Sequence, residues 1–129
     1  MAKSKRPTKP KRDEEREERI SMEIVVDAHD EDERAMGWFY YLEDKLTFPF
    51  LTRCISERAT SPLPVGAEVE VVGMAPADEC KRELFVETPW EHKRTLAVPL
   101  SQLKVVNGDD ETQRAVEDWH YWVGMGYEF

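Results

Sequence analysis

The sequence contains few of the residues on which most catalytic and metal-binding motifs depend. Two cysteines and three histidines are present among 129 residues, and none of them form a CxxC or HxxxH pair. This composition gives no indication of a zinc site, and Cys54 and Cys80 allow one disulfide at most. The six glycines are scattered and no nucleophile elbow is present, so the sequence lacks a phosphate-binding loop and a hydrolase signature. These absences disfavour an enzyme.

Long apolar runs are also missing from the sequence. No stretch approaches the roughly 20 consecutive apolar residues that a transmembrane helix needs. The basic N-terminal residues MAKSKRPTKPKR are not followed by an apolar segment, so they do not fit the pattern of a secretory signal. We therefore expect a cytoplasmic protein with no membrane segment, in which both cysteines are free thiols.

Charge is distributed unevenly along the chain, whose formal net charge is −9. Residues 1–19 contain eight basic and five acidic residues, a net charge of +3, and we expect them to form a disordered tail with at most a transient helix. Residues 20–129 contain ten basic and 22 acidic residues, a net charge of −12, and we expect them to form one domain. Such an acidic surface repels nucleic acids and anionic membranes, and it attracts cations or basic proteins.

The order of sequence patterns predicts an α+β fold. The segment ISMEIVV is rich in β-branched residues and predicts a first strand. A helix follows, because Asp27 or Asp30 can cap it and apolar residues recur every three to four positions as far as Leu46. Pro49 prevents its continuation and favours an extended segment over residues 48–55.

Patterns typical of strands dominate the middle of the sequence, and a second helix follows them. Alternating residues predict a strand over residues 68–71, and the segments ELFVETPW and RTLAVPLSQLKVV predict two more. NGDDETQ marks the start of a helix, with Asp109 or Asp110 as its cap and Gly124 and Gly126 at its end. We expect a small twisted antiparallel sheet or an SH3-like barrel with two flanking helices.

Glu43 and Asp44 lie where the first predicted helix ends, which is an unfavourable place for negative charge. A helix C-terminus carries a partial negative charge, so each carboxylate costs about 0.3–1 kcal/mol there unless Lys45 or a bound cation offsets the repulsion. Calcium takes oxygen ligands from carboxylates and main-chain carbonyls, and a helix end supplies both. Glu43 and Asp44 are therefore candidate calcium ligands, and a surface turn beside Lys45 is the alternative.

Four further carboxylates are candidate ligands, although each has a simpler explanation. Asp78 and Glu79 lie in a predicted loop, where acidic residues usually face solvent, and Asp110 and Glu111 lie at a predicted helix start, where the dipole favours them. The segment DAHDEDERAMGW is not an EF-hand, because Asp32 occupies the position that requires glycine. A calcium site in this chain must therefore combine separate segments.

Five blocks of the sequence form a recognisable series when taken in order: RAMGWFYYLEDKLTFPF, VGAEVEVVGMAP, ADEC, LAVPLSQL and ETQRAVEDWHYWVGMGY. Together they resemble the small calcium-binding protein family of the CcbP type. The resemblance extends from about Ile20 to about Tyr127 and implies a non-EF-hand calcium binder that buffers or senses the ion in the cytoplasm. In cyanobacteria the family is linked to calcium signalling in cell differentiation. The resemblance also implies a ligand role for Asp44, the aspartate of YLED, with Glu43 beside it.

The leading hypothesis is a monomeric cytoplasmic calcium-binding protein without enzymatic activity. The first alternative is an SH3-like interaction module that uses its acidic surface to bind a basic protein and holds no metal. The second alternative is a protein that binds nucleic acid through its basic N-terminal tail, which the acidity of residues 20–129 disfavours.

Overall fold

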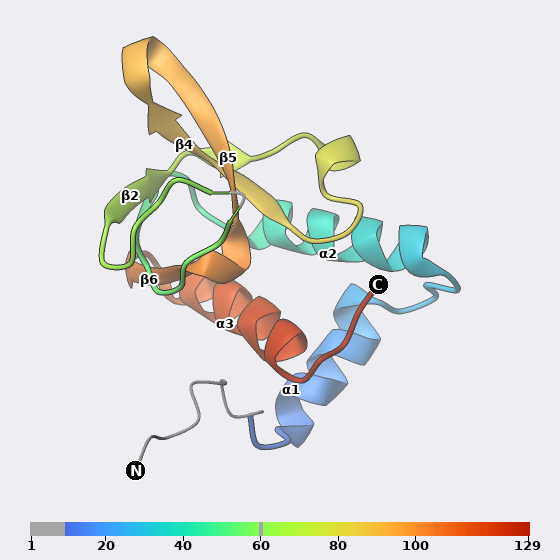
Figure 1. The fold of residues 1–129 in the computed structure, drawn as a ribbon. Coiled ribbons are helices and arrows are strands. Elements are labelled where there is room, and N and C mark those ends of the chain that lie inside the picture. The colour runs from blue at the N-terminus through green and yellow to red at the C-terminus, as the bar shows by residue number, and fades with distance from the viewer. Residues whose placement is uncertain (1–9, 60) are drawn as a thin grey trace.

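The structure, a computed structural model, describes residues 10–59 and 61–129 and confirms the predicted α+β fold (Figure 1). The strands are β1 (Phe50–Cys54), β2 (Glu68–Val71), β3 (Gly73–Met74), β4 (Phe85–Trp90), β5 (Arg94–Pro99) and β6 (Leu103–Asn107). They form two antiparallel sheets of three strands, in the orders β2-β1-β6 and β3-β4-β5. The described strands do not close into a barrel, so the SH3-like description fits only loosely.

One segment whose pattern predicts a single strand contributes to both sheets. RTLAVPLSQLKVV divides into β5 and β6, because a 3-10 turn over Leu100–Gln102 separates them. β5 pairs with β4, whereas β6 pairs with β1. Leu100, the first residue of the turn, and Leu103, which follows the turn directly, are fully buried, so the chain crosses the core at the point where it changes sheets.

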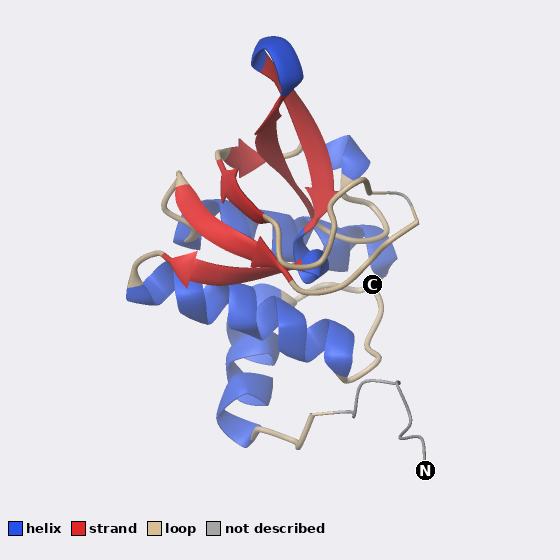
Figure 2. Ribbon diagram, turned by 60° about the vertical axis from the view of Figure 1, so that its left-hand side comes forward, coloured by secondary structure: helices blue, strands red, loops and turns tan. Residues whose placement is uncertain are grey.

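The two predicted helices are confirmed. Helix α2 spans Glu31–Lys45, and its cap Asp30 accepts a hydrogen bond from the main-chain N–H of Glu33 at 2.9 Å. Helix α3 spans Asp110–Gly124, and its cap Asp109 accepts a hydrogen bond from the main-chain N–H of Thr112 at 2.8 Å. Both helices lie along one side of the sheets (Figures 1 and 2).

The first strand predicted from ISMEIVV is wrong, because this segment is helical. Helix α1 (Glu14–Arg19) continues directly into η1, a π-helical turn over Ile20–Ile24. Ile20 and Ile24 are buried and the three residues between them are exposed, a spacing of four that suits a helix rather than a strand. The β-branched residues were therefore a misleading signal, and the burial of one face of the turn against the domain decides its conformation.

Residues 1–19 are expected to form a disordered tail, but residues 13–19 of this segment fold against the domain. Asp13 caps α1 by accepting a hydrogen bond from the Arg16 main-chain N–H at 3.0 Å. Glu17 accepts hydrogen bonds from the hydroxyl groups of Tyr121 and Tyr127, both at 2.7 Å. Polar contacts with α3 and the C-terminal segment therefore order this charged helix, although none of its residues is buried. Residues 1–9 lie outside the described part of the chain.

The core lies between the helices and the sheets, and aromatic residues occupy its centre. The rings of Trp38 in α2 and Trp119 in α3 have centroids 5.0 Å apart at an interplanar angle of 70°, a favourable edge-to-face arrangement. Cys54 and Cys80 are buried free thiols, as the sequence analysis expected. No helix within residues 10–59 and 61–129 is long and apolar enough to cross a membrane.

Candidate functional site

Two hydrogen bonds join the C-terminal end of α2 to the N-terminal end of α3. The main-chain N–H of Thr47 donates to Thr112 Oγ1 at 2.9 Å, and the Thr47 hydroxyl group donates to Asp109 Oδ2 at 2.9 Å. The two helix ends therefore lie side by side, although they are more than 60 positions apart in the sequence. We call this contact between the end of α2 and the start of α3 the helix junction.

The helix junction brings the end of α2, which carries Asp44 and Lys45, close to the predicted pair Asp110–Glu111 at the start of α3. Glu43, the residue before Asp44, is exposed and takes part in neither ion pair of Lys45.

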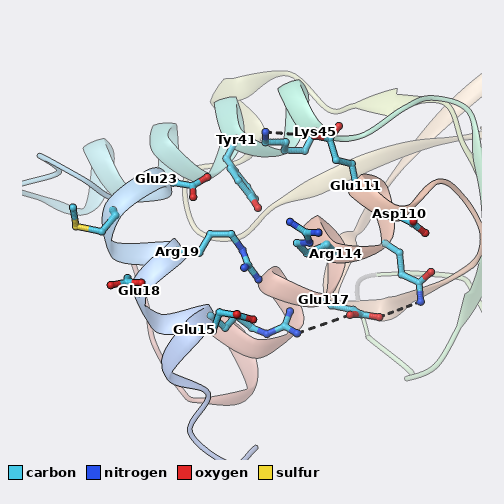
Figure 3. Close-up of a pocket in the computed structure, with 13 residues that line it drawn as sticks. Glu15, Glu18, Arg19, Glu23, Tyr41, Lys45, Asp110, Glu111, Arg114 and Glu117 are labelled. Atoms are coloured by element: carbon cyan, nitrogen blue, oxygen red, sulfur yellow. Dashed lines mark hydrogen bonds and ion pairs between the residues drawn. The ribbon is translucent and has the colours of Figure 1, made fainter.

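Lys45 interacts with a carboxylate from each of these helix ends. Its Nζ atom lies 3.8 Å from Asp44 Oδ2 and 3.6 Å from Glu111 Oε2, and Figure 3 shows Lys45 and Glu111 facing one another. The side chain of Asp44 is 77% exposed and that of Glu111 is 62% exposed, so each ion pair contributes only about 0–1 kcal/mol. The carboxylates of Asp44 and Glu111 therefore share the ammonium group of Lys45, which each of them holds only weakly.

Asp109 precedes Asp110 and Glu111, and its carboxylate stabilises the contact between the two helices. Hydrogen bonds from Thr112 and from the Thr47 hydroxyl group lower the pKa of Asp109. Each of its carboxylate oxygens accepts one of the described hydrogen bonds, one at the start of α3 and one from Thr47. Asp109 is therefore already engaged in holding the junction together, whereas Asp110 is exposed and follows it in the first turn.

Asp78 and Glu79 do not join this group of carboxylates. They lie in a 3-10 turn between β3 and β4, and the following Lys81 lines a surface hollow with Glu31 at the N-terminal end of α2. Asp44 lies at the opposite end of this helix of 15 residues, which is about 20 Å long. Both acidic groups are candidate ligands in the sequence, but the fold separates them.

A larger charged cleft lies between α1, η1, α2 and α3 (Figure 3). Its volume is about 900 Å³. Carboxylates from α1 and η1 on one side and from α3 on the other line it, together with four basic side chains. The cleft ends at the helix junction, because Lys45, Asp110 and Glu111 belong to its lining. The other charged residues that line it are Glu15, Arg16, Glu18, Arg19, Glu23, Arg114 and Glu117.

Asp118 is a buried carboxylate beside this cleft, and its role was not foreseen from the sequence. It accepts hydrogen bonds from Arg16 Nη1 at 2.8 Å, from Arg19 Nε and Nη2 at 3.0 and 2.8 Å, and from the Tyr41 hydroxyl group at 2.8 Å. Its side chain is 0% exposed. These four donors compensate the buried charge and attach α1 to α2 and α3.

The environment of Asp118 keeps its partners in the required protonation states. The hydrogen bond with Asp118 is the main cause of the raised pKa of Arg19, so the guanidinium remains charged. Burial, followed by the bond with Asp118, raises the pKa of Tyr41, so its hydroxyl group remains a donor. A signal for this cluster does exist in the sequence: Asp118 lies four residues before Trp122, on the apolar face of the predicted helix.

Side chains in the described part of the chain do not form a ready-made metal cage. Among residues 10–59 and 61–129, no group of three or more His, Cys, Asp or Glu side chains converges closely enough to hold a metal ion. The helix junction nevertheless has the donor chemistry that calcium prefers, namely exposed carboxylates and the oxygens at a helix end. Of the six predicted ligands, Asp44 and Glu111 are the two whose carboxylates lie 3.8 and 3.6 Å from the ammonium group of Lys45.

The fold and the junction define a small acidic α+β protein with oxygen-rich surface clusters. The family model for calcium binding by CcbP proteins matches residues 18–123. The chain belongs to this CcbP family, which confirms the resemblance seen in the sequence.

Two solved structures are similar to the chain over nearly its whole length. One is the crystal structure of Anabaena CcbP, with 43% identity and a TM-score of 0.83, covering 95% of this chain and 100% of that chain. The other is a calcium-binding protein in its calcium-binding form, with 44% identity and a TM-score of 0.80, covering 92% of this chain and 96% of that chain. No curated protein matches the chain with significant similarity.

Proposed function

We propose that this chain binds calcium at the junction of α2 and α3 and acts as a non-EF-hand calcium buffer or sensor. Membership of the CcbP family supports calcium as the ion. The observation that carries the proposed position is that Asp44 and Glu111, from two different helices, share the ammonium group of Lys45. A divalent cation interacts more strongly with two carboxylates than a single ammonium group does.

The proposed ligands are Asp44, Glu111 and the neighbouring Asp110, completed by main-chain oxygens and water. Calcium tolerates such a mixed set, because its coordination number and geometry are flexible. The exposed carboxylates must lose side-chain freedom on binding, so we expect a moderate affinity. Glu43 is adjacent to this set, whereas Asp78 and Glu79 are proposed as a separate, weaker position because the fold holds them elsewhere.

Removing one ligand charge from the junction is expected to weaken calcium binding by on the order of tenfold, because carboxylate count sets the affinity of such sites. The variants are Asp44→Asn and Glu111→Gln, and isothermal titration calorimetry measures their affinity and stoichiometry. Glu91→Gln is the matched control, since it removes one exposed carboxylate that belongs to neither proposed position, and Glu79→Gln tests the 3-10 turn separately. Unchanged binding in both junction variants, with a loss in Glu79→Gln, would move the site to the 3-10 turn.

Calcium is also expected to raise the melting temperature of the wild-type protein. A ligand at about 100 times its Kd that binds only the folded state adds about 2.7 kcal/mol of stability, which corresponds to a rise of several degrees. Thermal melting in calcium, magnesium and EDTA measures this effect. Identical melting curves in all three solutions contradict calcium binding and favour the metal-free interaction module.

Other properties follow from the composition and charge of the chain and are part of the proposal. The lack of apolar segments supports a protein of the cytoplasm, and the lack of catalytic motifs supports an action without a catalytic step; we further propose that the protein is monomeric. The net charge of −12 over residues 20–129 supports basic proteins as partners and disfavours nucleic acids. Light scattering at several protein concentrations tests the monomeric state.

A further inference from the structure

A surface groove lies between α2 and the turn that follows η1, away from the carboxylates of the helix junction. Its volume is about 370 Å³, and the buried Ile24 lines it together with Val26 and Tyr40. Val26 is 48% exposed and Tyr40 is 59% exposed. Single exposed apolar residues are common on proteins, but apolar residues gathered in one depression are typical of a binding surface.

The spacing of residues along α2 explains the shape of the groove. Glu33, Met36, Gly37 and Tyr40 recur every three to four positions, so they share one face of the helix, and all four line the groove. Gly37 has no side chain, which allows the main chain of Ile24 to lie close against this face of α2. Met36 is only partly buried, and its flexible side chain can adapt to different apolar groups.

Acidic residues border this apolar surface. Asp27, Asp32 and Glu33 line the groove, and none of the described residues that line it is basic. The resulting negative potential repels anionic membranes, nucleic acids and the same face of a second copy of the chain. It attracts lysine and arginine side chains, so the charge favours a basic protein segment as the occupant.

We propose that this groove binds a basic amphipathic segment of a partner protein. An apolar side chain of the partner enters beside Val26 and Tyr40, while its lysine or arginine residues pair with Asp27 and Asp32. Tyrosine is frequent at the energetic centre of protein interfaces, and helical segments commonly dock an apolar face in this way. The inference is independent of the proposed calcium site, because no residue of the groove belongs to that site.

The experiment uses a synthetic helical peptide of lysine and leucine with one tryptophan, added to the full chain in EDTA so that calcium plays no part. In the NMR spectrum of the isotope-labelled protein, the largest amide shifts are expected at residues 24–28 and 36–40. The double variant Val26→Ser/Tyr40→Ser is expected to raise the Kd by on the order of tenfold or more. Val123→Ser, which alters an apolar side chain 41% exposed on α3, is the matched control and keeps the wild-type Kd.

A second arm tests the charge of the groove. The variant Asp27→Asn/Asp32→Asn is expected to bind the peptide more weakly, and its affinity should depend less on salt concentration. A peptide with glutamate in place of lysine should not bind to the wild-type protein. Asparagine suits position 27, where the main-chain φ of 61° lies in the left-handed region. Equal affinity of the Val26/Tyr40 and Val123 variants, shifts confined to the charged cleft, or self-association through this face would overturn the proposal. The shift map requires no variant, so misfolding of a variant leaves the proposal testable.

Discussion

Replacing both Arg16 and Arg19 with methionine is expected to destabilise the folded protein by about 3–5 kcal/mol, because it leaves a buried charge without its counter-ions. Asp118 is 0% exposed and receives three of its four hydrogen bonds from these two arginines. Only the Tyr41 hydroxyl group would remain as a donor among the described contacts. Methionine retains most of the apolar stem of arginine, so the variant isolates the loss of charge and hydrogen bonds.

Urea unfolding, followed by the fluorescence of the four tryptophans, measures this loss of stability. The matched control adds Asp118→Leu to the two arginine changes, because removing the carboxylate as well eliminates the uncompensated charge. This triple variant should recover much of the lost stability. If the double and triple variants are equally unstable, the cost arises from lost packing of α1 rather than from the buried charge.

Gly37→Ala is expected to destabilise the protein by about 1–3 kcal/mol, which is opposite to the usual effect of this change within a helix. Alanine normally stabilises a helix interior by about 0.5–1 kcal/mol relative to glycine. Here a Cβ atom on Gly37 would overlap the main-chain oxygen of Ile24, and a main chain in a packed turn cannot move as easily as a flexible side chain. The substitution should force α2 and η1 apart.

Gly73→Ala provides the control for this prediction. No heavy atom lies within 4 Å of a Cβ atom built on Gly73, so we expect its unfolding free energy to change little. Thermal or urea unfolding compares the two variants under the same conditions. A Gly37→Ala protein as stable as wild type would show that η1 tolerates displacement from α2.

Local signals in the sequence were sufficient to predict the main helices and most strands. Each helix start has two candidate caps in the sequence, and the structure selects Asp30 over Asp27 and Asp109 over Asp110. A cap acts within its own helical turn, so the approximate helix starts were predictable from local sequence. The π-helical turn at Ile20–Ile24 was missed, since its β-branched residues favour a strand locally and packing overrides that preference. The division of β5 from β6 was missed for a similar reason: pairing with different sheets is a long-range property.

The candidate site was only partly predictable from the sequence. The position of Asp44 at a helix end drew attention to it, but its proximity to Glu111 depends on bonds between Thr47 and α3 that no local pattern encodes. The position of Asp118 on the apolar face of its helix is a local signal of burial, but the arginines that compensate its charge lie about 100 positions away in the sequence. Both features depend on tertiary contacts between segments that are remote in the chain.

Lys45 places a positive charge at the helix junction that is part of the chain itself. Its ammonium group is covalently tethered next to Asp44, so its effective concentration there is constant whatever the composition of the surrounding solution. An ion that binds at the proposed site must compete with this ammonium group, which lowers the apparent affinity of the site for the ion. A tethered competitor of this kind suits brief occupancy during a transient rise in ion concentration more than long-term storage.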